Sequence, residues 1–204
     1  NTFDHWELEN HLIIDPNLIN ITLSLSQSDS ITAVYSSNET SDIVINEINY
    51  HSSDEFDSGD WAELYNAADE AVDISSWTFK DENDEHIFLI PENTILLSGE
   101  YLVLCRDTTS FTALFPDVNN FIGDLSFGLS NGGELLRLYD MDGILTDFVT
   151  YDDADPWAVE ADGNGPTLEL IDPLNDNTLA ENWAPSSGNG TPGSINSVSI
   201  LSNY

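Results

Sequence analysis

Short runs in which apolar and polar residues alternate follow one another between residues 43 and 196, with turn-forming residues between them. Successive side chains of a strand point to opposite faces, so this period-two pattern predicts strands with a buried face. No amphipathic stretch is long enough for a stable helix, and one short helical turn is expected at residues 111–115. The pattern predicts an all-β sandwich rather than a parallel α/β sheet. The expected strands cover residues 43–50, 61–65, 72–74, 77–79, 87–90, 94–97, 101–105, 134–139 and 144–151.

The clearest turn signal is Asp142-Gly143, which lies between two strand-like runs. Asp-Gly pairs favour tight β-hairpins, in which both central turn positions need a positive φ angle. Asp140 and Asp142 also resemble the start of an EF-hand calcium loop. The twelfth position counted from Asp140 is Tyr151, however, where such a loop needs an acidic residue. We therefore expect a hairpin here and no EF-hand.

Residues 1–41 are predicted to form a short N-terminal β segment that ends in a polar linker. Its runs contain too few large apolar side chains for an independent core. Phe3-Asp4-His5-Trp6 and the closing Ile31-Thr32-Ala33-Val34-Tyr35 resemble the end of the small β-repeats that are common in bacterial cell-surface proteins. The chain opens in the middle of a predicted strand, so we expect it to be part of a longer protein. The strands expected in this segment cover residues 3–8, 21–25 and 31–35.

Charge narrows the range of partners. Lys and Arg total 3 against 38 Asp and Glu, which gives a formal net charge of -35. Such a polyanion repels phosphate backbones and anionic lipid, so we expect no nucleic-acid binding and no membrane insertion, and it attracts cations. The acidic residues are interleaved with 40% hydrophobic residues, which argues against a disordered acidic tail. No apolar stretch approaches the roughly 20 residues of a membrane-spanning helix.

Motifs for catalysis are missing from the sequence. The histidines have no zinc-site spacing, and neither a Gly-x-Ser-x-Gly elbow nor a phosphate-binding loop occurs. The single cysteine, Cys105, is expected to be a buried, inert thiol on the strand face that it shares with Tyr101 and Val103. Glu47 and Glu63 lie among large apolar residues, and we expect them to accept hydrogen bonds from backbone N–H groups of a loop. We therefore assign no catalytic residue.

Eleven different short motifs follow one another in a defined order over residues 43–196. They are Ile45-Asn46-Glu47-Ile48, Trp61-Ala62-Glu63-Leu64-Tyr65-Asn66, Val72-Asp73-Ile74-Ser75-Ser76-Trp77, Ser98-Gly99-Glu100-Tyr101-Leu102-Val103-Leu104, Leu129-Ser130-Asn131-Gly132-Gly133-Glu134, Asp147-Phe148-Val149-Thr150-Tyr151, Pro156-Trp157, Asp162-Gly163-Asn164-Gly165, Thr167-Leu168-Glu169-Leu170, Asn182-Trp183 and Gly190-Thr191-Pro192-Gly193. Together they resemble the lamin tail domain in its secreted bacterial form. The resemblance implies an immunoglobulin-like β-sandwich with long loops over residues 42–197, followed by a tail over residues 198–204.

The resemblance also implies a function. Lamin tail domains are not known as enzymes and usually sit beside other modules, so we expect a non-catalytic binding, adhesion or structural module of a larger secreted or cell-surface bacterial protein. The alternative is an accessory domain that positions a linked kinase-like, nuclease or phosphatase domain, or that binds carbohydrate. Expected partners are neighbouring domains of the same polypeptide and protein or polysaccharide at the cell surface. Four tryptophans could stack on sugar rings, but we expect core and corner packing for Trp61, Trp77, Trp157 and Trp183.

Acidic loop residues are the candidate metal ligands. Ca²⁺ takes about six to eight oxygen ligands from carboxylates, amides and carbonyls. Loops near Trp61 and Trp157 are rich in such groups, although no spacing matches a defined calcium motif, and acidic loops also arise by chance in a chain this acidic. The candidate calcium ligands are Asp57, Asp60, Asp152, Asp153, Asp155, Asp162 and Asn164. No other cofactor is expected.

Overall fold

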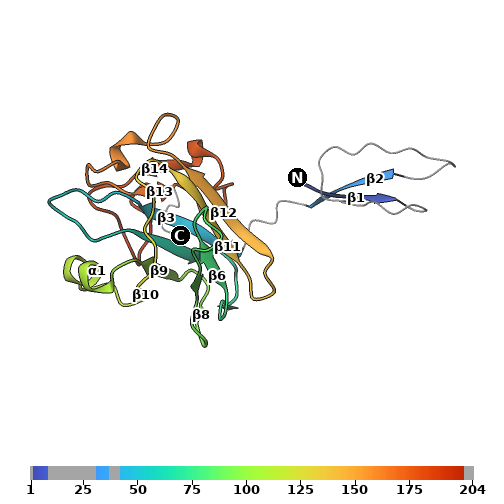
Figure 1. Ribbon diagram of the computed structural model, residues 1–204, viewed down its shortest axis with the longest axis horizontal. Coiled ribbons are helices and arrows are strands. Elements are labelled where there is room, and N and C mark those ends of the chain that lie inside the picture. Colours follow the sequence, from blue (N-terminus) through green and yellow to red (C-terminus); the bar gives the residue numbers. More distant parts are fainter. Residues whose placement is uncertain (1, 9–30, 37–41, 200–204) are drawn as a thin grey trace. The chain divides into compact units, whose positions relative to one another are not determined.

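The computed structural model describes residues 2–8, 31–36 and 42–199, and the chain divides into two units, Asn1–Glu39 and Thr40–Tyr204 (Figure 1). In the first unit, β1 (Thr2–Leu8) pairs in antiparallel fashion with β2 (Ile31–Ser36). These strands confirm two of the three predicted there. The third, at residues 21–25, lies outside the described residues, as does the end of the predicted C-terminal tail.

The second unit is a β-sandwich, as the alternating pattern predicts. A six-stranded sheet has the order β10–β9–β4–β3–β13–β14, a four-stranded sheet has the order β12–β11–β6–β7, and β5 pairs with β8 (Figure 1). All pairs are antiparallel except β9 with β10. The strands are β3 (Ile43–Asn49), β4 (Trp61–Asn66), β5 (Val72–Asp73), β6 (Thr78–Lys80), β7 (Phe88–Leu89), β8 (Ile95–Leu96), β9 (Tyr101–Cys105), β10 (Phe121–Gly123), β11 (Glu134–Tyr139), β12 (Leu145–Tyr151), β13 (Leu168–Leu170) and β14 (Trp183–Pro185).

The core follows from the period-two pattern. In β11, Leu136 and Leu138 are buried while the intervening Leu135 and Arg137 are only partly covered. These leucines belong to the same apolar cluster as Ile45 and other residues of the six-stranded sheet, so the two sheets share one interior. β3 is buried at all seven positions, so both of its faces are covered.

A second, smaller core lies on the outer face of β4 and β9. The helix α1 (Thr108–Leu114) packs Phe111 against Trp61, Val103 and Cys105. Asp107 caps the helix by accepting hydrogen bonds from the backbone N–H groups of residues 109 and 110. The helix joins β9 to β10, which makes one parallel pair that the sequence pattern does not predict. A helix of seven residues is too short to show a helical period, and its cap and packing stabilise it.

Helices are few and short. Besides α1, the described part of the chain contains the 3₁₀ helices η1 (Val159–Ala161) and η2 (Ala180–Asn182). None of the helices in that part is long and apolar enough to cross a membrane.

The predicted hairpin joins β11 to β12, but its turn differs from the expected one. Only Gly143 has a positive φ angle, at 78°, and Asp142 does not. Asp140 Oδ1 accepts hydrogen bonds from the N–H groups of Asp142 and Ile144, at 2.9 and 2.8 Å. These side-chain bonds stabilise a wider turn that needs a left-handed residue at one position only.

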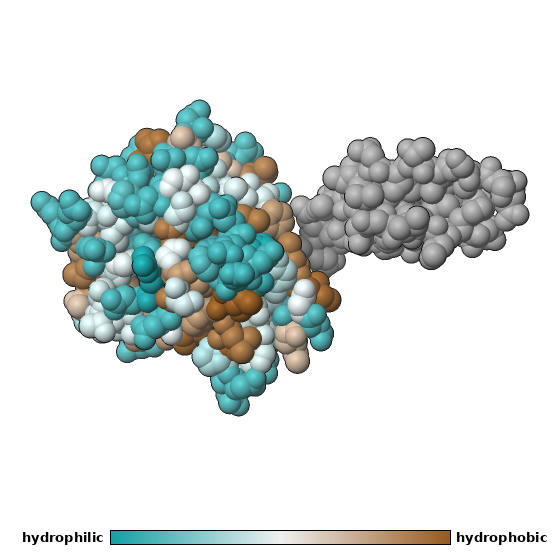
Figure 2. Space-filling model, in the orientation of Figure 1, coloured by the Kyte–Doolittle hydropathy of each residue, from teal (hydrophilic) through white to brown (hydrophobic). Residues whose placement is uncertain are grey.

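Hydrophilic residues cover most of the face in view, and apolar side chains form small patches between them (Figure 2). Such a surface agrees with the acidic composition. Exposed apolar side chains also gather near the short strands β7 and β8, at Ile87, Leu89, Ile95 and Leu97.

Candidate functional site

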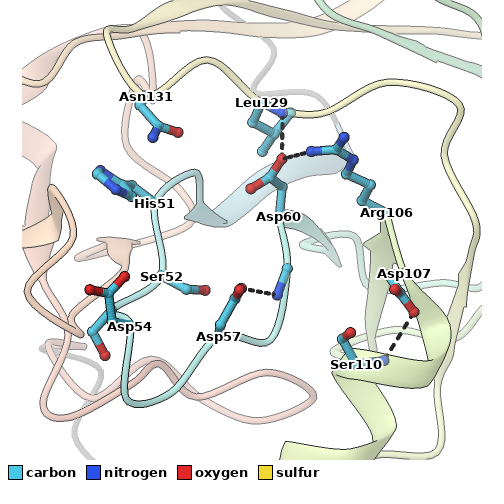
Figure 3. Close-up of a pocket in the computed structure, with 12 residues that line it drawn as sticks. His51, Ser52, Asp54, Asp57, Asp60, Arg106, Asp107, Ser110, Leu129 and Asn131 are labelled. Carbon is cyan, nitrogen blue, oxygen red and sulfur yellow. Dashed lines mark hydrogen bonds and ion pairs between the residues drawn. The ribbon is translucent and has the colours of Figure 1, made fainter.

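A polar pocket of about 540 Å³ lies at the end of the sandwich where β3 and β9 end and β4 begins. Three loops form it: the β3–β4 loop, the entry to α1, and the segment before β11. Its walls are mainly hydroxyl, carboxylate and amide groups (Figure 3). The lining residues are His51, Ser52, Ser53, Asp54, Asp57, Gly59, Asp60, Arg106, Asp107, Ser110, Leu129 and Asn131.

Asp60 is the best-anchored carboxylate of the pocket. Its Oδ2 atom accepts hydrogen bonds from Arg106 Nη1 at 3.2 Å and from the Leu129 N–H at 3.0 Å (Figure 3). Burial raises the pKa of Asp60, and these two donors oppose the rise. A side chain at Gly128 would meet the ends of both the Arg106 and the Asp60 side chains, so a larger residue there would force this ion pair to shift.

Hydrogen bonds from Gly59, Trp61 and Asn49 stabilise the loop that carries Asp57. Asp57 Oδ1 accepts a hydrogen bond from the Gly59 N–H at 3.0 Å, and buried Ser58 accepts one from Trp61 Nε1 at 3.2 Å. Asn49 Nδ2 donates to Ser58 Oγ at 3.1 Å and to the Gly59 carbonyl at 2.9 Å. The structure thus places two predicted calcium ligands, Asp57 and Asp60, in one pocket with a fixed backbone.

His51 connects this pocket to a second acidic group. Its Nδ1 atom lies 2.6 Å from Asp162 Oδ1, and both side chains are 38% exposed. The Gly163 N–H donates to the His51 carbonyl at 3.1 Å, which brings the two loops together. The sequence holds no signal for this contact, because His51 and Asp162 are 111 positions apart.

The second acidic group consists of Asp152, Asp153 and Asp162. A hydrogen bond with Asp152 is the largest cause of a raised pKa at Asp153, and the charges of Asp152 and Asp162 add to it. The hydroxyl of Tyr50 is buried without a hydrogen-bond partner. Burial, followed by the charges of Asp162, Asp153 and Asp152, raises the pKa of Tyr50.

The two other candidate ligands are placed differently. Asn164 Nδ2 donates to the backbone carbonyl of Asp162 at 2.7 Å, so its amide stabilises the loop. Asp155 precedes the cis peptide bond to Pro156. Over residues 42–199, no three His, Cys, Asp or Glu side chains are arranged to hold a metal ion. Calcium binding therefore stays a prediction, with its candidate residues divided between two neighbouring groups.

The chain was compared with known protein families, curated proteins and solved structures. The family model for the lamin tail domain matches residues 36–153, more than half of the 204 residues. The chain belongs to the lamin tail domain family. The immunoglobulin-like sandwich expected from the sequence is confirmed with it. No curated protein matches the chain. Matching solved structures include a DUF4876 family protein from Bacteroides thetaiotaomicron, which is 9% identical, with 79% of this chain and 71% of that chain covered and a TM-score of 0.48.

This lamin tail domain buries a row of three glutamates on adjacent strands of its six-stranded sheet. Glu47 on β3 lies opposite Glu63 on β4 and opposite Glu169 on β13, and each is 0% exposed. The Thr191 N–H donates to Glu47 Oε1 at 3.0 Å, and the Gly193 N–H donates to Glu63 Oε2 at 2.5 Å. The expected bonds from loop N–H groups are thereby confirmed.

Sequence reasoning missed Glu169 and a second buried acid, Asp147. Asp147 Oδ2 accepts hydrogen bonds from the Ile45 N–H at 2.7 Å and from Asn177 Nδ2 at 2.8 Å. Burial raises the pKa of Asp147 to about 7. Period-two alternation in β12 places Asp147 on the same face as buried Val149, and this is the signal that could have found it.

The tryptophans and the cysteine behave as predicted. Trp61, Trp77, Trp157 and Trp183 are at most 9% exposed, so they pack in the interior and do not form a surface platform for sugar rings. Cys105 is buried, and burial raises its pKa to about 11. A thiol in this state is a poor nucleophile at neutral pH.

Proposed function

We propose that this lamin tail domain is a non-catalytic binding module of a larger secreted or cell-surface bacterial protein, and that the loop-end pocket holds its partner. The pocket supports this because its volume of about 540 Å³ falls within the roughly 300–1,000 Å³ of ligand sites, and because its polar groups converge from three loops. The location outside the cell is supported by the acidic composition and by the family's occurrence in secreted bacterial proteins.

The pocket's chemistry favours a ligand rich in hydrogen-bond donors. Ionised carboxylates only accept hydrogen bonds, and Asp54, Asp57, Asp60 and Asp107 outnumber the single guanidinium of Arg106. One oxygen each of Asp57, Asp60 and Asp107 already accepts hydrogen bonds, which leaves Asp54 and the second oxygens of these three residues for a ligand. Hydroxyl and ammonium groups match these acceptors. Such groups are carried by polysaccharide, by amino sugars and by lysine-bearing segments of a surface protein.

An accessory role beside a linked enzyme is compatible with the same pocket.

The alternative to a non-catalytic module is a hydrolase centred on the pair His51–Asp162, since the histidine lines the pocket. That reading needs a hydroxyl nucleophile within hydrogen-bond reach of the imidazole. Among the residues that the structure describes, His51 has no hydrogen bond to a serine, threonine or tyrosine hydroxyl, although Ser52 and Ser53 line the same pocket.

The pocket is tested by a double substitution at its rim. We expect Asp54→Asn with Asp57→Asn to weaken binding to neutral and amino-sugar glycans at least about tenfold, because two charge-assisted hydrogen bonds become weaker. Both side chains are exposed, so the fold should be preserved. A glycan array, followed by calorimetry on the best binder, measures the effect.

Asp69→Asn, an exposed change outside the pocket, is the matched control and should bind as the unmodified domain does. The same preparation should show no hydrolysis of glycosides, phosphoesters or peptides. Equal affinity in the double variant and the control would exclude the pocket as the binding site, and turnover that depends on His51 would favour the hydrolase.

We also propose that calcium binds near Asp152, Asp153 and Asp162, whose carboxylates do not form a ready three-ligand site and would have to move toward the ion. The hydrogen bond with Asp152 is the main cause of the raised pKa of Asp153, and a cation would offset the smaller contributions from the charges of Asp152 and Asp162. Binding to the native state adds RT ln(1 + [L]/Kd) of stability. We expect calcium at about 5 mM to raise the melting temperature well above the rise that sodium chloride of equal ionic strength produces. Asp153→Asn should lose the extra rise, and Asp142→Asn in the β11–β12 hairpin should keep it. Equal shifts of the melting temperature with the two salts would mean that charge screening explains the whole effect and that no calcium site exists.

A further inference from the structure

The C-terminal strap, defined as residues 190–198, covers the glutamate row without forming a strand. Residues 182–204 contain no charged side chain, in a chain that has 38 Asp and Glu. An acidic residue in the strap would lie against the buried carboxylates and be repelled by them. The uncharged strap therefore adds no electrostatic repulsion to the buried glutamates that it covers.

Hydrogen bonds to the three glutamates are the main attachment of the strap. Five strap donors bind them: the backbone N–H groups of Thr191, Gly193 and Val198, and the hydroxyls of Thr191 and Ser197. Asn196 adds bonds outside the row: its Nδ2 donates to the Asn46 carbonyl at 3.0 Å and to the Leu170 carbonyl at 2.9 Å, and its Oδ1 accepts from Asn46 Nδ2 at 2.9 Å. Because the strap has no strand ladder and five of its donors bind the glutamates, the state of the carboxylates affects how firmly it is held.

Glu47, in the middle of the row, has a free position for a proton. Its Oε1 atom accepts from Thr167 Oγ1 at 2.6 Å and from the Thr191 N–H at 3.0 Å, while its buried Oε2 atom has no hydrogen-bond partner. Glu63 and Glu169 each use both carboxylate oxygens as acceptors. A proton on Glu47 Oε2 disturbs no hydrogen bond, whereas a proton on either neighbour would compete with a donor.

No positive charge compensates this row. The titratable groups around Glu47 are Glu63 and the phenol of Tyr65 on β4, Tyr101 on β9, and Glu169 on β13, and the strap adds none. The basic side chains of the described domain bind elsewhere, as Lys80 donates to the Asp84 carbonyl, Arg106 pairs with Asp60, and Arg137 pairs with Asp84. A second and third buried negative charge would therefore be opposed only by hydrogen-bond donors.

We propose that Glu47 carries a proton on Oε2 at neutral pH while the strap is docked, and that the strap is therefore held progressively less firmly as pH rises. Burial, followed by the charges of Glu63 and Glu169, raises the pKa of Glu47 well above its usual value, and burial raises the pKa of Glu63 to about 8. In the open state these carboxylates meet water and recover ordinary pKa values. The closed state then binds more protons than the open state, so a rise in pH favours opening.

Hydrogen exchange of the strap amides tests this device in the unmodified domain. We expect the protection of the Thr191, Gly193 and Val198 N–H groups, corrected for the intrinsic pH dependence of exchange, to fall as pH rises from about 5, by up to about tenfold per pH unit for each proton that opening releases. The protection should level off once the pH exceeds the raised pKa values of the docked carboxyl groups. The amide of Val103 in β9 should keep its protection. A strap whose protection does not change up to about pH 9.5 would overturn the proposal.

Glu47→Gln separates the proton from the rest of the contact. The amide oxygen can replace Oε1 as the acceptor, and the NH₂ group takes the place of the unpartnered Oε2, so a permanently neutral side chain keeps the observed bonds. We expect the strap of this variant to lose the part of the pH response that one proton on Glu47 supplies, and the exposed Glu70→Gln to retain the whole response. An unchanged response in Glu47→Gln would assign the titration to another group.

A direct measurement requires no substitution. The ¹³C shift of the Glu47 carboxyl carbon in the unmodified domain should report a protonated acid at pH 7. An ionised Glu47 at that pH would overturn the proposal even if the glutamine variant failed to fold.

Discussion

Asp147→Ala is expected to lower the free energy of unfolding by roughly 3–5 kcal/mol, since it leaves buried donors unpaired and a small cavity. The lost bonds are those from the Ile45 N–H and from Asn177 Nδ2. Ile45 adjoins the bulge where the β3–β4 register shifts, so Asp147 of one sheet fixes an irregular strand of the other. Urea unfolding near pH 5 measures the loss, and the change should appear in the midpoint with the m-value preserved.

Asp147→Asn is the matched control, because its amide oxygen can still accept both bonds. It also isolates a pH effect. The native pKa of Asp147 is raised to about 7, so the native state holds a proton that the unfolded state loses near pH 4. The stability of the unmodified domain relative to Asp147→Asn should therefore fall as pH rises between these values, by up to about 1.4 kcal/mol per pH unit. A stability difference that is independent of pH would show that Asp147 titrates normally.

Gly190→Ala is expected to lower the free energy of unfolding by about 3 kcal/mol and to detach the strap. Gly190 has a φ angle of 95°, and an added Cβ would lie 2.6 Å from Glu47 Oε1 and 2.9 Å from Thr167 Cγ2. The left-handed backbone costs a non-glycine residue roughly 1–2 kcal/mol, and overpacking adds about 1–3 kcal/mol. Thermal unfolding and exchange of the strap amides should both report the damage.

Gly188→Ala separates the backbone cost from the collision. Gly188 has a similar φ angle, 86°, but an added Cβ would meet nothing within 4 Å. It should therefore lose only the backbone contribution, about 1–2 kcal/mol, and keep the strap docked. Equal losses at the two positions would show that the seat on the glutamate row adds nothing to stability.

The strands and their buried faces were accessible to sequence reasoning because they depend on neighbours along the chain. Alternation in β11 and β12, and the Asp142-Gly143 signal between them, predicted the hairpin. The turn type was wrong because the Asp140 side chain supplies its own acceptor. The parallel pair of β9 and β10 was missed because the helix between them has only seven residues.

The candidate sites depend on longer distances along the chain. Asp57 and Asp60 were predicted as ligands from one loop, but the pocket also needs Arg106 and Leu129 from two others. His51 meets Asp162 across 111 positions, and Gly193 meets Glu63 across 130. The periodicity of a single sequence carries no information on contacts between residues so far apart. The acidic residues were therefore predicted as candidate ligands, but their separation into two spatial groups was not.

The sequence by itself determined the all-β class, the buried faces of the strands, the interior tryptophans, the inert Cys105 and the family, because each follows from residue type and local order. Tertiary structure alone decided which carboxylates meet, which oxygens receive donors, and where a pocket remains open. The physical reason is that the charge state of a buried acid depends on desolvation and on groups brought to it by folding. Glu47 illustrates both parts, since its position in a strand was evident from the chain and its unpartnered oxygen only from the fold.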